Sequence, residues 1–557
     1  MVLPDPKQIQ ILVSSTICES INNRLNNVPP WKIITVTASS VLTTVWLWNF
    51  IFQPESVYSR SKKYMFKLAR KIPFIAEKID KEMSDITKSF KDDVEERCKS
   101  VPFNISLNTK GKTKEDILEE LRKNLNLGSF DWKHGFVSGT VYYHSEELID
   151  ILTNVYGLAS YTNPLHPDVF PGVNKMEAEV VRIALNLFHG GPDSCGTMTT
   201  GGTESILMAC KAYRDFGREE KGITKPEMIL PRTAHPAFEK GAEYFGIKIK
   251  FIPVDPKTTK VSIEKIKRAI SSRTVMIVGS VPNYPYGTMD DIEAIAAIGK
   301  KYKIPVHVDS CLGGFLTVFM PAAGFEFPPY DFAVPGVTSI SADTHKYGYA
   351  PKGSSLILYS HSKYRHAQYC VTTDWPGGIY GSPAVNGSRA GGIIAACWAT
   401  LMYFGMDGYV EATKKIIQVS RYIESELRKI KEIYIFGQPV TSVIAMGSDL
   451  FHIYRLSEKL NEKGWNLNPL QFPSGIHLCV THMHTQEGVA DCFIKDVKEI
   501  VRELLKEPLL KVEGKMAVYG MSHEIPDRTI VADFTRLYID SMYYTPKEEK
   551  TCVNGVI

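Results

Sequence analysis

The chain has 557 residues, of which 44% are hydrophobic and 23% are charged, with a formal net charge of +4. At about 150 residues per domain this length suits two packed domains with accessory segments, and the near balance of charge excludes the strong basic field of a nucleic-acid-binding protein. The ten cysteines form no CxxC pair and no zinc-like spacing, so we expect reduced thiols in a cytosol-facing body and no metal site.

The first predicted element is a hydrophobic segment near the N-terminus. Residues 33–52 carry no charge, and their length matches the ~20 residues that one transmembrane helix needs. Six basic residues follow between positions 60 and 71, whereas residues 1–30 hold two basic and two acidic residues. The positive-inside rule therefore predicts a luminal segment over 1–30, a single transmembrane helix over 31–53 and a cytosolic body.

Other interpretations of this hydrophobic segment stay open. Six serine and threonine residues make it only moderately apolar, so a buried or interfacial helix is the main alternative. A cleaved signal peptide fits less well, because the apolar run starts far from Met1 and exceeds a usual signal-peptide core. With the predicted orientation, the glycosylation sequons at Asn104 and Asn386 should stay unmodified.

The next predicted segments are a charged stalk and a large domain. Residues 54–115 are polar with mixed charges, which indicates a solvated helix or stalk. Over 116–370 a helix at 176–188 and later helices alternate with short apolar strands, predicted at residues 228–231, 249–254, 275–281, 305–309, 338–342 and 354–359. This alternation predicts an α/β fold whose mostly parallel sheet is covered on both faces by helices. Ligand groups then belong at the carboxyl ends of the strands.

A second, smaller domain is predicted over residues 371–540. Its expected helices cover 392–404 and 410–429, and its expected strands cover 442–446 and 476–481. The tail over 541–557 carries no pattern that we can interpret.

Two residues at predicted strand ends indicate cofactor chemistry. Asp309 ends one strand, and Lys346 follows another strand directly after His345. A lysine amine can form a Schiff base with the aldehyde of pyridoxal phosphate, and a carboxylate can keep the pyridine nitrogen protonated. A His-Lys pair alone would be weak evidence, since most lysines are solvated surface charges. The prediction of pyridoxal phosphate therefore rests on both residues together.

Two further features stand in the expected chain order. A loop that contains Gly201, Gly202 and Thr203 leads into a helical segment, and a helix N-terminus of this kind can bind a phosphate. An ordinary glycine turn is the alternative. His235 follows the strand at 228–231 and could lie flat on a pyridine ring, although considered alone it fits better as a buried histidine with satisfied hydrogen bonds.

These residues together resemble the decarboxylase-like group of fold-type-I pyridoxal phosphate enzymes, and within it the sphingosine-1-phosphate lyases. The resemblance is carried by residues 138–142, 163–172, 200–205, 234–235, 307–309, 343–348 and 377–380. It extends from about Trp31 to about Tyr519. Thr200 stands where we expect serine, which keeps the hydroxyl.

The resemblance implies a fold-type-I transferase fold with a large cofactor domain and a smaller C-terminal α+β domain, assembled as a homodimer with shared active sites. It implies that Lys346 binds the cofactor, that Asp309 faces the pyridine nitrogen and that His235 stacks on the ring. The remaining residues implied to contact the cofactor are Gly201, Gly202, Thr203, His307 and His345. The implied reaction is retro-aldol cleavage of sphingosine 1-phosphate and related long-chain base phosphates to a fatty aldehyde and phosphoethanolamine, in sphingolipid degradation.

The proton acceptor of this reaction is left open among four candidates, which are Lys352, Tyr142, His166 and Tyr380. Any of them could instead bind the substrate phosphate. Lys352 could also be a surface turn lysine, and the tyrosines could be core residues with satisfied hydroxyls. In this fold Tyr142 or Tyr380 could come from the partner subunit.

Two other functions compete with the lyase. A soluble amino-acid decarboxylase would share the same cofactor residues and would need a cation, such as Arg389 or Lys352, for the substrate carboxylate. A cofactor-free membrane scaffold is a further possibility, although the intact Lys346 and Asp309 argue against it. The resemblance implies that the predicted single-pass anchor lies in the endoplasmic reticulum membrane, and the balanced net charge predicts no nucleic-acid partner.

Overall fold

The structure is a computed structural model that describes residues 22–24, 26–51, 57–512 and 527–546. The chain divides into two compact units. The first contains residues 1–93 and 533–543, and the second contains residues 94–532 and 544–557. Most of the predicted luminal segment 1–30 and most of the tail lie outside the described residues.

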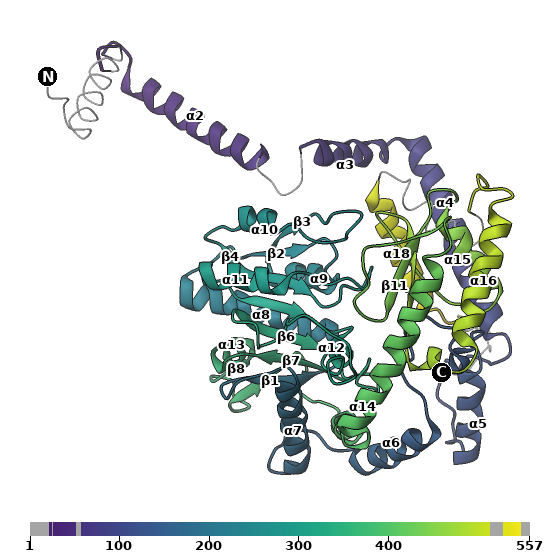
Figure 1. Cartoon of the computed structure of the whole chain (residues 1–557). Helices are drawn as coiled ribbons and strands as arrows, with labels where there is room; N and C mark the ends of the chain where they lie inside the picture. Colours follow the sequence, from purple (N-terminus) through teal and green to yellow (C-terminus); the bar gives the residue numbers. More distant parts are fainter. Residues whose placement is uncertain (1–21, 25, 52–56, 513–526, 547–557) are drawn as a thin grey trace, which may run out of the picture. The chain divides into compact units, whose positions relative to one another are not determined.

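The described part of the first unit contains helices joined by turns, and no strand (Figure 1). It holds α2 (Pro30–Ile51), α3 (Val57–Ala69), most of α4 (Pro73–Cys98) and most of α18 (Arg528–Met542). The ring of Phe90 on α4 meets that of Tyr538 on α18 edge-on, with centroids 5.6 Å apart. No residue of α4 is buried, which agrees with a solvated helix in the predicted stalk 54–115. The stalk function itself stays a prediction.

The predicted transmembrane segment falls on α2. Residues 52 and 53 of the predicted span lie outside the described part of the chain. Among the described residues, the helix that is long and apolar enough to cross a membrane is α14 (Gly391–Leu427) in the second unit, not α2. Because α14 contributes many buried residues to the core, we interpret it as a core helix. A membrane crossing by α2 therefore stays a prediction.

The second unit is built around a seven-stranded sheet in the order β1-β7-β6-β5-β4-β2-β3. The strands are β1 (Cys195–Thr199), β2 (Glu227–Pro231), β3 (Lys248–Ile252), β4 (Thr274–Ser280), β5 (Val306–Asp309), β6 (Val337–Ala342) and β7 (Ser355–Tyr359). Neighbours from β3 to β6 are parallel, while β7 is antiparallel to both β6 and β1. The predicted parallel sheet is confirmed, and β1 is the strand that the sequence reading missed.

Alternating side chains of the sheet face different helices, as the two-residue period of a strand requires. Met228 and Leu230 of β2 join the cluster formed with α8 and α9, whereas Ile229 packs with α10 and α11. The helices of this region are α5 (Lys114–Leu125), α6 (Glu146–Ala159), α7 (Pro171–Leu187), α8 (Gly202–Lys221), α9 (Ala237–Phe245), α10 (Ile263–Ala269), α11 (Ile292–Tyr302), α12 (Gly314–Thr317) and α13 (Ser362–Gln368). Helices therefore cover both faces of the sheet, as predicted.

A smaller antiparallel sheet follows in the order β10-β11-β13-β12. Its strands are β10 (Tyr434–Ile435), β11 (Val443–Gly447), β12 (Asn468–Leu470) and β13 (Gly475–Cys479). The helix α15 (Ile453–Glu462) packs against β13, and α16 (Val489–Leu504) packs against α15. A hairpin of β8 (Cys370–Thr372) and β9 (Tyr380–Ser382) precedes α14. The two helices predicted over 392–404 and 410–429 are the two halves of α14, which meet at the non-helical Gly405.

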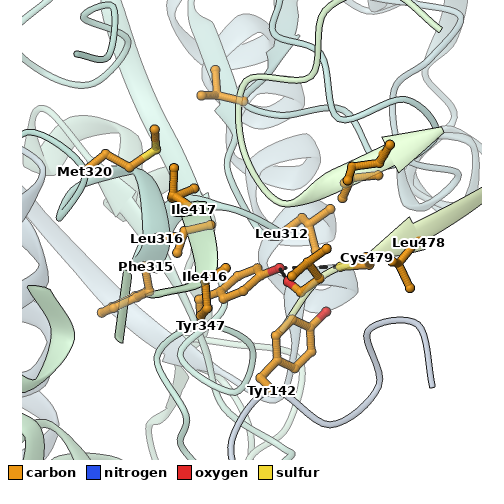
Figure 2. Close-up of a cluster of buried hydrophobic side chains, with 14 of the residues drawn as sticks. Tyr142, Leu312, Phe315, Leu316, Met320, Tyr347, Ile416, Ile417, Leu478 and Cys479 are labelled. Atoms are coloured by element: carbon orange, nitrogen blue, oxygen red, sulfur yellow. Dashed lines mark hydrogen bonds between the residues drawn. The ribbon is translucent and has the colours of Figure 1, made fainter. Parts of the chain in front are cut away.

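One continuous apolar core joins the elements of both sheets (Figure 2). Leu316 of α12, Ile416 of α14 and Leu478 of β13 all belong to it. Tyr347 lies inside this core, and its hydroxyl donates to the Val480 carbonyl at 2.7 Å. The chain directly after Lys346 is thereby attached to the smaller sheet.

Candidate active site

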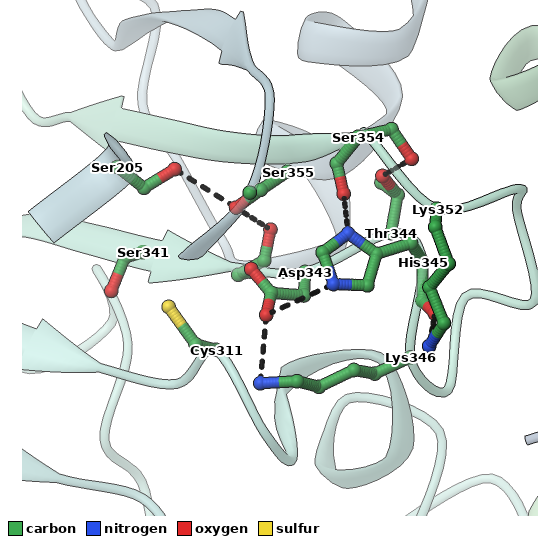
Figure 3. A network of polar contacts seen from close by, with 12 residues as sticks. Ser205, Cys311, Ser341, Asp343, Thr344, His345, Lys346, Lys352, Ser354 and Ser355 are labelled. Carbon is green, nitrogen blue, oxygen red and sulfur yellow. Dashed lines mark hydrogen bonds and ion pairs between the residues drawn. The ribbon is translucent and has the colours of Figure 1, made fainter. Parts of the chain in front are cut away.

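Lys346 follows β6 by four residues, in a turn beyond the carboxyl end of the strand. Its Nζ lies 2.8 Å from Asp343 Oδ2, and Figure 3 shows both Lys346 and His345 turned toward this carboxylate. Burial lowers the pKa of Lys346, but the charge and hydrogen bond of Asp343, together with the other negative groups around the amine, outweigh burial and raise it. In the cofactor-free protein Lys346 is therefore an ammonium group held by Asp343.

Asp343 is only 1% exposed at its side chain and is incompletely satisfied. Its Oδ1 atom has no hydrogen-bond partner among the described residues. A buried carboxylate oxygen without a partner is costly, so it marks a place where a ligand or an ordered water supplies a donor. Asp343 was part of a motif in the sequence, but it was not predicted as a site residue.

Asp309 is the last residue of β5 and lies beside Ser341 of β6 in the parallel register. Its Oδ1 accepts hydrogen bonds from the Cys311 amide at 3.1 Å and the Ser341 hydroxyl at 3.4 Å. Its Oδ2 has no hydrogen bond to a described residue and stays available for a donor such as a protonated pyridine nitrogen.

His307 lies behind Asp309 on the same strand and is fully buried. Its ring nitrogens contact Ser339 Oγ at 2.8 Å and Ser341 Oγ at 3.2 Å. Burial lowers the pKa of His307 to about 4, so the ring is neutral. Direct contact with the cofactor stays untested for His307, and this position favours a role in holding Ser341 and Asp309.

His235 shares the site with these residues. Burial lowers its pKa, and the charges of Asp309, Lys346 and Asp343 all act on its ring. Its Nδ1 accepts a hydrogen bond from the Ala237 amide at 3.1 Å, which leaves the proton on Nε2. The structure thus brings the predicted stacking residue to the predicted lysine and carboxylate.

The glycine loop reaches the same place from the N-terminus of α8. A Cβ on Gly202 would come within 2.8 Å of both Asp343 oxygens and of Cys311 Sγ, so a larger residue cannot fit without a shift. Gly201 lies beside the ring of His345. The free amides of the first turn and the helix dipole favour an anion here.

The two threonines of this loop differ in their surroundings. Thr203, in the first turn of α8, is exposed. Thr200 donates from its amide at 2.7 Å and from its hydroxyl at 2.6 Å to Glu204 Oε2. The Thr200 hydroxyl is therefore engaged within the loop, which leaves the backbone amides as the main phosphate donors.

Two of the four candidate proton acceptors lie close to Lys346. Lys352 Nζ donates to the His345 carbonyl at 3.2 Å and lies 4.9 Å from the centre of the Tyr142 ring. Partial burial and the positive charge of Lys346 lower the pKa of Lys352. Burial raises the pKa of Tyr142 well above its ordinary value, which keeps its phenol protonated. Lys352 is thus the better acceptor of the two.

The other two candidates are not gathered at this site within one chain. His166 is exposed between α6 and α7, and Tyr380 is half-buried in the β8–β9 hairpin. No described contact joins either of them to Lys346. Arg389, the other proposed cation, is bound to Glu177 of α7 rather than to a residue around Lys346.

Cys311 is a further site residue that sequence reasoning missed. Burial raises its pKa well above that of a free thiol, and the charges of Asp343 and Asp309 act in the same direction. The thiol is therefore protonated and fills the space between Gly202 and Asp343. Its position two residues after Asp309 was the only signal in the sequence.

Comparison with known proteins agrees with this geometry. Residues 98–446 match the pyridoxal-dependent decarboxylase conserved domain. The sphingosine-1-phosphate lyase of Drosophila melanogaster is 57% identical over 96% of this chain and 98% of its own, and sphingosine-1-phosphate lyase 1 of Mus musculus is 49% identical over 96% and 94%. The chain belongs to the sphingosine-1-phosphate lyase family.

Solved structures lead to the same family. The sphingosine-1-phosphate lyase of Burkholderia pseudomallei matches with a TM-score of 0.74 and 39% identity, over 81% of this chain and 99% of that one. A glutamate decarboxylase of Lactobacillus brevis matches with a TM-score of 0.63 at 21% identity, over 75% and 98%, which is a likeness of fold alone. The protein is therefore a pyridoxal-phosphate-dependent lyase.

The residues present fit this cofactor. The site offers an unpartnered carboxylate oxygen on Asp343, a free oxygen on Asp309 and a cradle of glycines at the start of α8. Groups of this kind suit the polar atoms and the phosphate of pyridoxal phosphate. Lys346 would hold the aldehyde, Asp309 the ring nitrogen, and the α8 amides with His345 the phosphate. The assignment of individual residues to these contacts remains a prediction.

Proposed function

We propose that this enzyme cleaves sphingosine 1-phosphate and related long-chain base phosphates by retro-aldol chemistry, to a fatty aldehyde and phosphoethanolamine, in sphingolipid degradation. The observation that carries the proposal is the site around Lys346, in a chain whose full-length relatives bear the name of this lyase. An amino-acid decarboxylase is less well supported, because the decarboxylase structures share only the fold with this chain.

The roles of the protein side chains follow from their positions. Bound pyridoxal phosphate supplies an electron sink for the carbon-carbon bond that breaks. Lys346 would hold the cofactor aldehyde through its amine, and Asp309 would offer its free Oδ2 to the ring nitrogen. His235 presents a neutral ring with its proton on Nε2.

Lys352 is our proposed acceptor for the proton of the substrate 3-hydroxyl. Its lowered pKa makes the neutral amine accessible nearer to neutral pH than for an ordinary lysine. Tyr142, whose pKa is raised, is suited to donate a hydrogen bond instead. The alternative role for Lys352 is to bind the substrate phosphate as a cation.

We also propose a homodimer with shared active sites. The loop between β8 and β9 exposes large apolar side chains, with Trp375 at 57% and Ile379 at 83% exposure, which supports a contact with a second copy. Tyr380 and His166 would then reach the Lys346 site of the partner. Mixed dimers of Lys346→Ala and Tyr380→Phe subunits should regain activity in one of their two sites, and equal inactivity of mixed and unmixed dimers would contradict this arrangement.

The proposed location is the endoplasmic reticulum membrane, with α2 as a single-pass anchor and the catalytic body in the cytosol. The charge asymmetry around α2 and the bilayer-soluble substrate support it. Glycosylation mapping tests the orientation, because a glycan on Asn104 or Asn386 would place the body on the luminal side.

Product analysis tests the proposed reaction. Detergent-solubilised protein with pyridoxal phosphate should release fatty aldehyde and phosphoethanolamine from a long-chain base phosphate, and Lys346→Ala should abolish both the products and the visible absorbance of the bound cofactor. Carbon dioxide released only from an amino acid would establish a decarboxylase instead. Inactivity on both substrate classes would favour a scaffold.

A further inference from the structure

The segment that contains α3 combines a high basic charge with a lack of acidic residues between Glu55 and Glu77. From Ser56 to Ala76 the sequence contains six lysine and arginine residues and no aspartate or glutamate. The following helix α4 mixes both signs of charge along its length. A purely basic segment of this length next to a candidate membrane helix is typical of proteins that bind anionic lipid headgroups.

The apolar residues of α3 form an exposed stripe. Tyr58, Met65 and Leu68 are spaced by seven and three residues, which places them on one face of the helix. Their exposed fractions are 78%, 68% and 46%, so no described part of the chain covers this face. Ile72 and Phe74 extend the exposed apolar surface just beyond the helix, at 50% and 75%.

Two basic residues of α3 lie on the side of the helix away from Tyr58 and Met65. Arg60 and Lys67 are seven residues apart and stand about 140–180° around the helix from those two residues. Lys62 lies beside the apolar stripe, where its long side chain can extend to the level of the headgroups. Apolar residues on one side and basic residues on the other are the pattern of a helix that lies in the plane of a membrane surface. A helix buried in the protein core would not leave both faces exposed.

Contacts with α2 and α18 hold α3 within the first unit. The Arg60 guanidinium donates to the carbonyl of Phe50 on α2 and lies 4.5 Å from the centre of the Phe50 ring. Arg70, which follows α3, forms an ion pair of 3.1 Å with Asp533 on α18. The basic face of α3 therefore begins at the end of α2, where a helix that crosses a membrane would leave it.

We propose that α3 binds the surface of an anionic phospholipid leaflet, with its apolar stripe at the boundary of headgroups and acyl chains and its lysines on lipid phosphates. This rests on the proposed anchoring by α2 and adds a second contact with defined lipid chemistry. A neutral protein surface would leave the basic residues of α3 without compensating charge. A headgroup layer that carries negative charge supplies it.

Amide hydrogen exchange of the full-length protein in lipid nanodiscs tests this proposal. Residues 57–72 should exchange more slowly in discs that contain phosphatidylserine than in discs of phosphatidylcholine alone, and added salt should weaken the difference. The double variant Lys67→Glu, Lys71→Glu should lose the difference, because each basic residue near an anionic surface contributes about fivefold to binding. The double variant Lys81→Glu, Lys88→Glu on α4 has the same charge change and should keep it.

Other outcomes would overturn the proposal. Equal protection of residues 57–72 in neutral and anionic discs would show that α3 buries apolar residues in lipid without recognising anionic headgroups. Absence of protection in both kinds of disc would show that α3 does not contact lipid. Protection in detergent that rises with protein concentration would identify a second copy as the occupant. Product formation and resistance of the protein to a high-salt wash, measured in the same discs, report separately on the proposed reaction and on anchoring by α2.

Discussion

At the scale of single residues, the site depends on neighbouring side chains that bind Lys346 and Asp309 and fix their positions. Asp343 pairs with Lys346 at 2.8 Å, and Ser341 links Asp309 to the buried His307. These supporting residues position the two groups that the cofactor requires. Their contributions can be separated by substitution.

The ion pair of Lys346 and Asp343 should be strongly coupled in the cofactor-free protein. Lys346→Ala leaves a buried carboxylate without its partner, which we expect to lower the free energy of unfolding by about 3 kcal/mol. Adding Asp343→Asn removes the buried charge and should restore part of this loss. Urea unfolding of the two single variants and the double variant measures the coupling, and strictly additive effects would show that the pair is not coupled.

The role of Lys352 can be resolved by Lys352→Arg. A proton acceptor must be neutral, so activity that depends on Lys352 is present above its pKa and is lost as pH falls through it. Arginine stays protonated, so this variant should lose at least about a hundredfold in kcat at every pH if Lys352 is the acceptor. A variant that keeps kcat and changes only KM would identify Lys352 as a phosphate-binding residue instead.

At the scale of elements, most strands and helices near the site agree with their predicted ranges. The missed strand β1 reads Cys-Gly-Thr-Met-Thr, which lacks an apolar run. It lies at the edge of the sheet, where Arg182 donates to the Ser194 carbonyl at 3.2 Å and Glu177 accepts from the Met198 amide at 3.3 Å. Side chains of α7 thus bond to backbone groups at this edge strand. No local sequence pattern could indicate such contacts.

The junction inside α14 should depend on glycine at position 405. Gly405 has a φ of 55°, which side-chain-bearing residues rarely adopt, and no atom would contact an added Cβ. We expect Gly405→Ala to destabilise the protein by about 1 kcal/mol through backbone strain alone. Gly157→Ala within α6 also meets no atom, but its backbone is helical, so it should stabilise by about 0.5–1 kcal/mol. Thermal unfolding of both variants tests whether their stability changes have opposite signs. A Gly405→Ala variant that is more stable than the parent protein would contradict the proposed backbone strain.

At the scale of the whole molecule, buried neutral histidines make stability depend on pH. Burial lowers the pKa of His307, His477 and His484 to about 4 each. Since the unfolded chain binds protons at about pH 6.5 and the folded chain does not, stability is complete above that pH and falls as pH decreases toward 4. Each such histidine lowers the free energy of unfolding by up to about 2 kcal/mol at pH 5.

His477 provides the test of this pH dependence. Its Nδ1 donates to the Pro285 carbonyl at 3.0 Å, and the ring is fully buried. His477→Gln should flatten the decrease in the urea midpoint between pH 7 and pH 5, whereas His366→Gln, at an exposed position, should leave the slope unchanged. An unaltered slope in His477→Gln would show that this histidine is not responsible.

The chemistry at the strand ends could be predicted from the sequence, because strand period and loop composition are local properties. Lys346, Asp309, His235 and the glycine loop were predicted from their own segments, and the structure brings them together. The family resemblance, carried by short local motifs, was equally readable.

The side chains that surround those residues could be identified only in the folded chain, since contacts between distant segments form on folding. Asp343 pairs with Lys346, and His307 is buried behind Ser341. His166, in contrast, is exposed and lies apart from this site. These positions follow from packing between distant segments, which no local sequence pattern indicates. The exposed stripe of α3 belongs here too, because a periodic sequence indicates a face but only the folded chain shows that nothing described covers it.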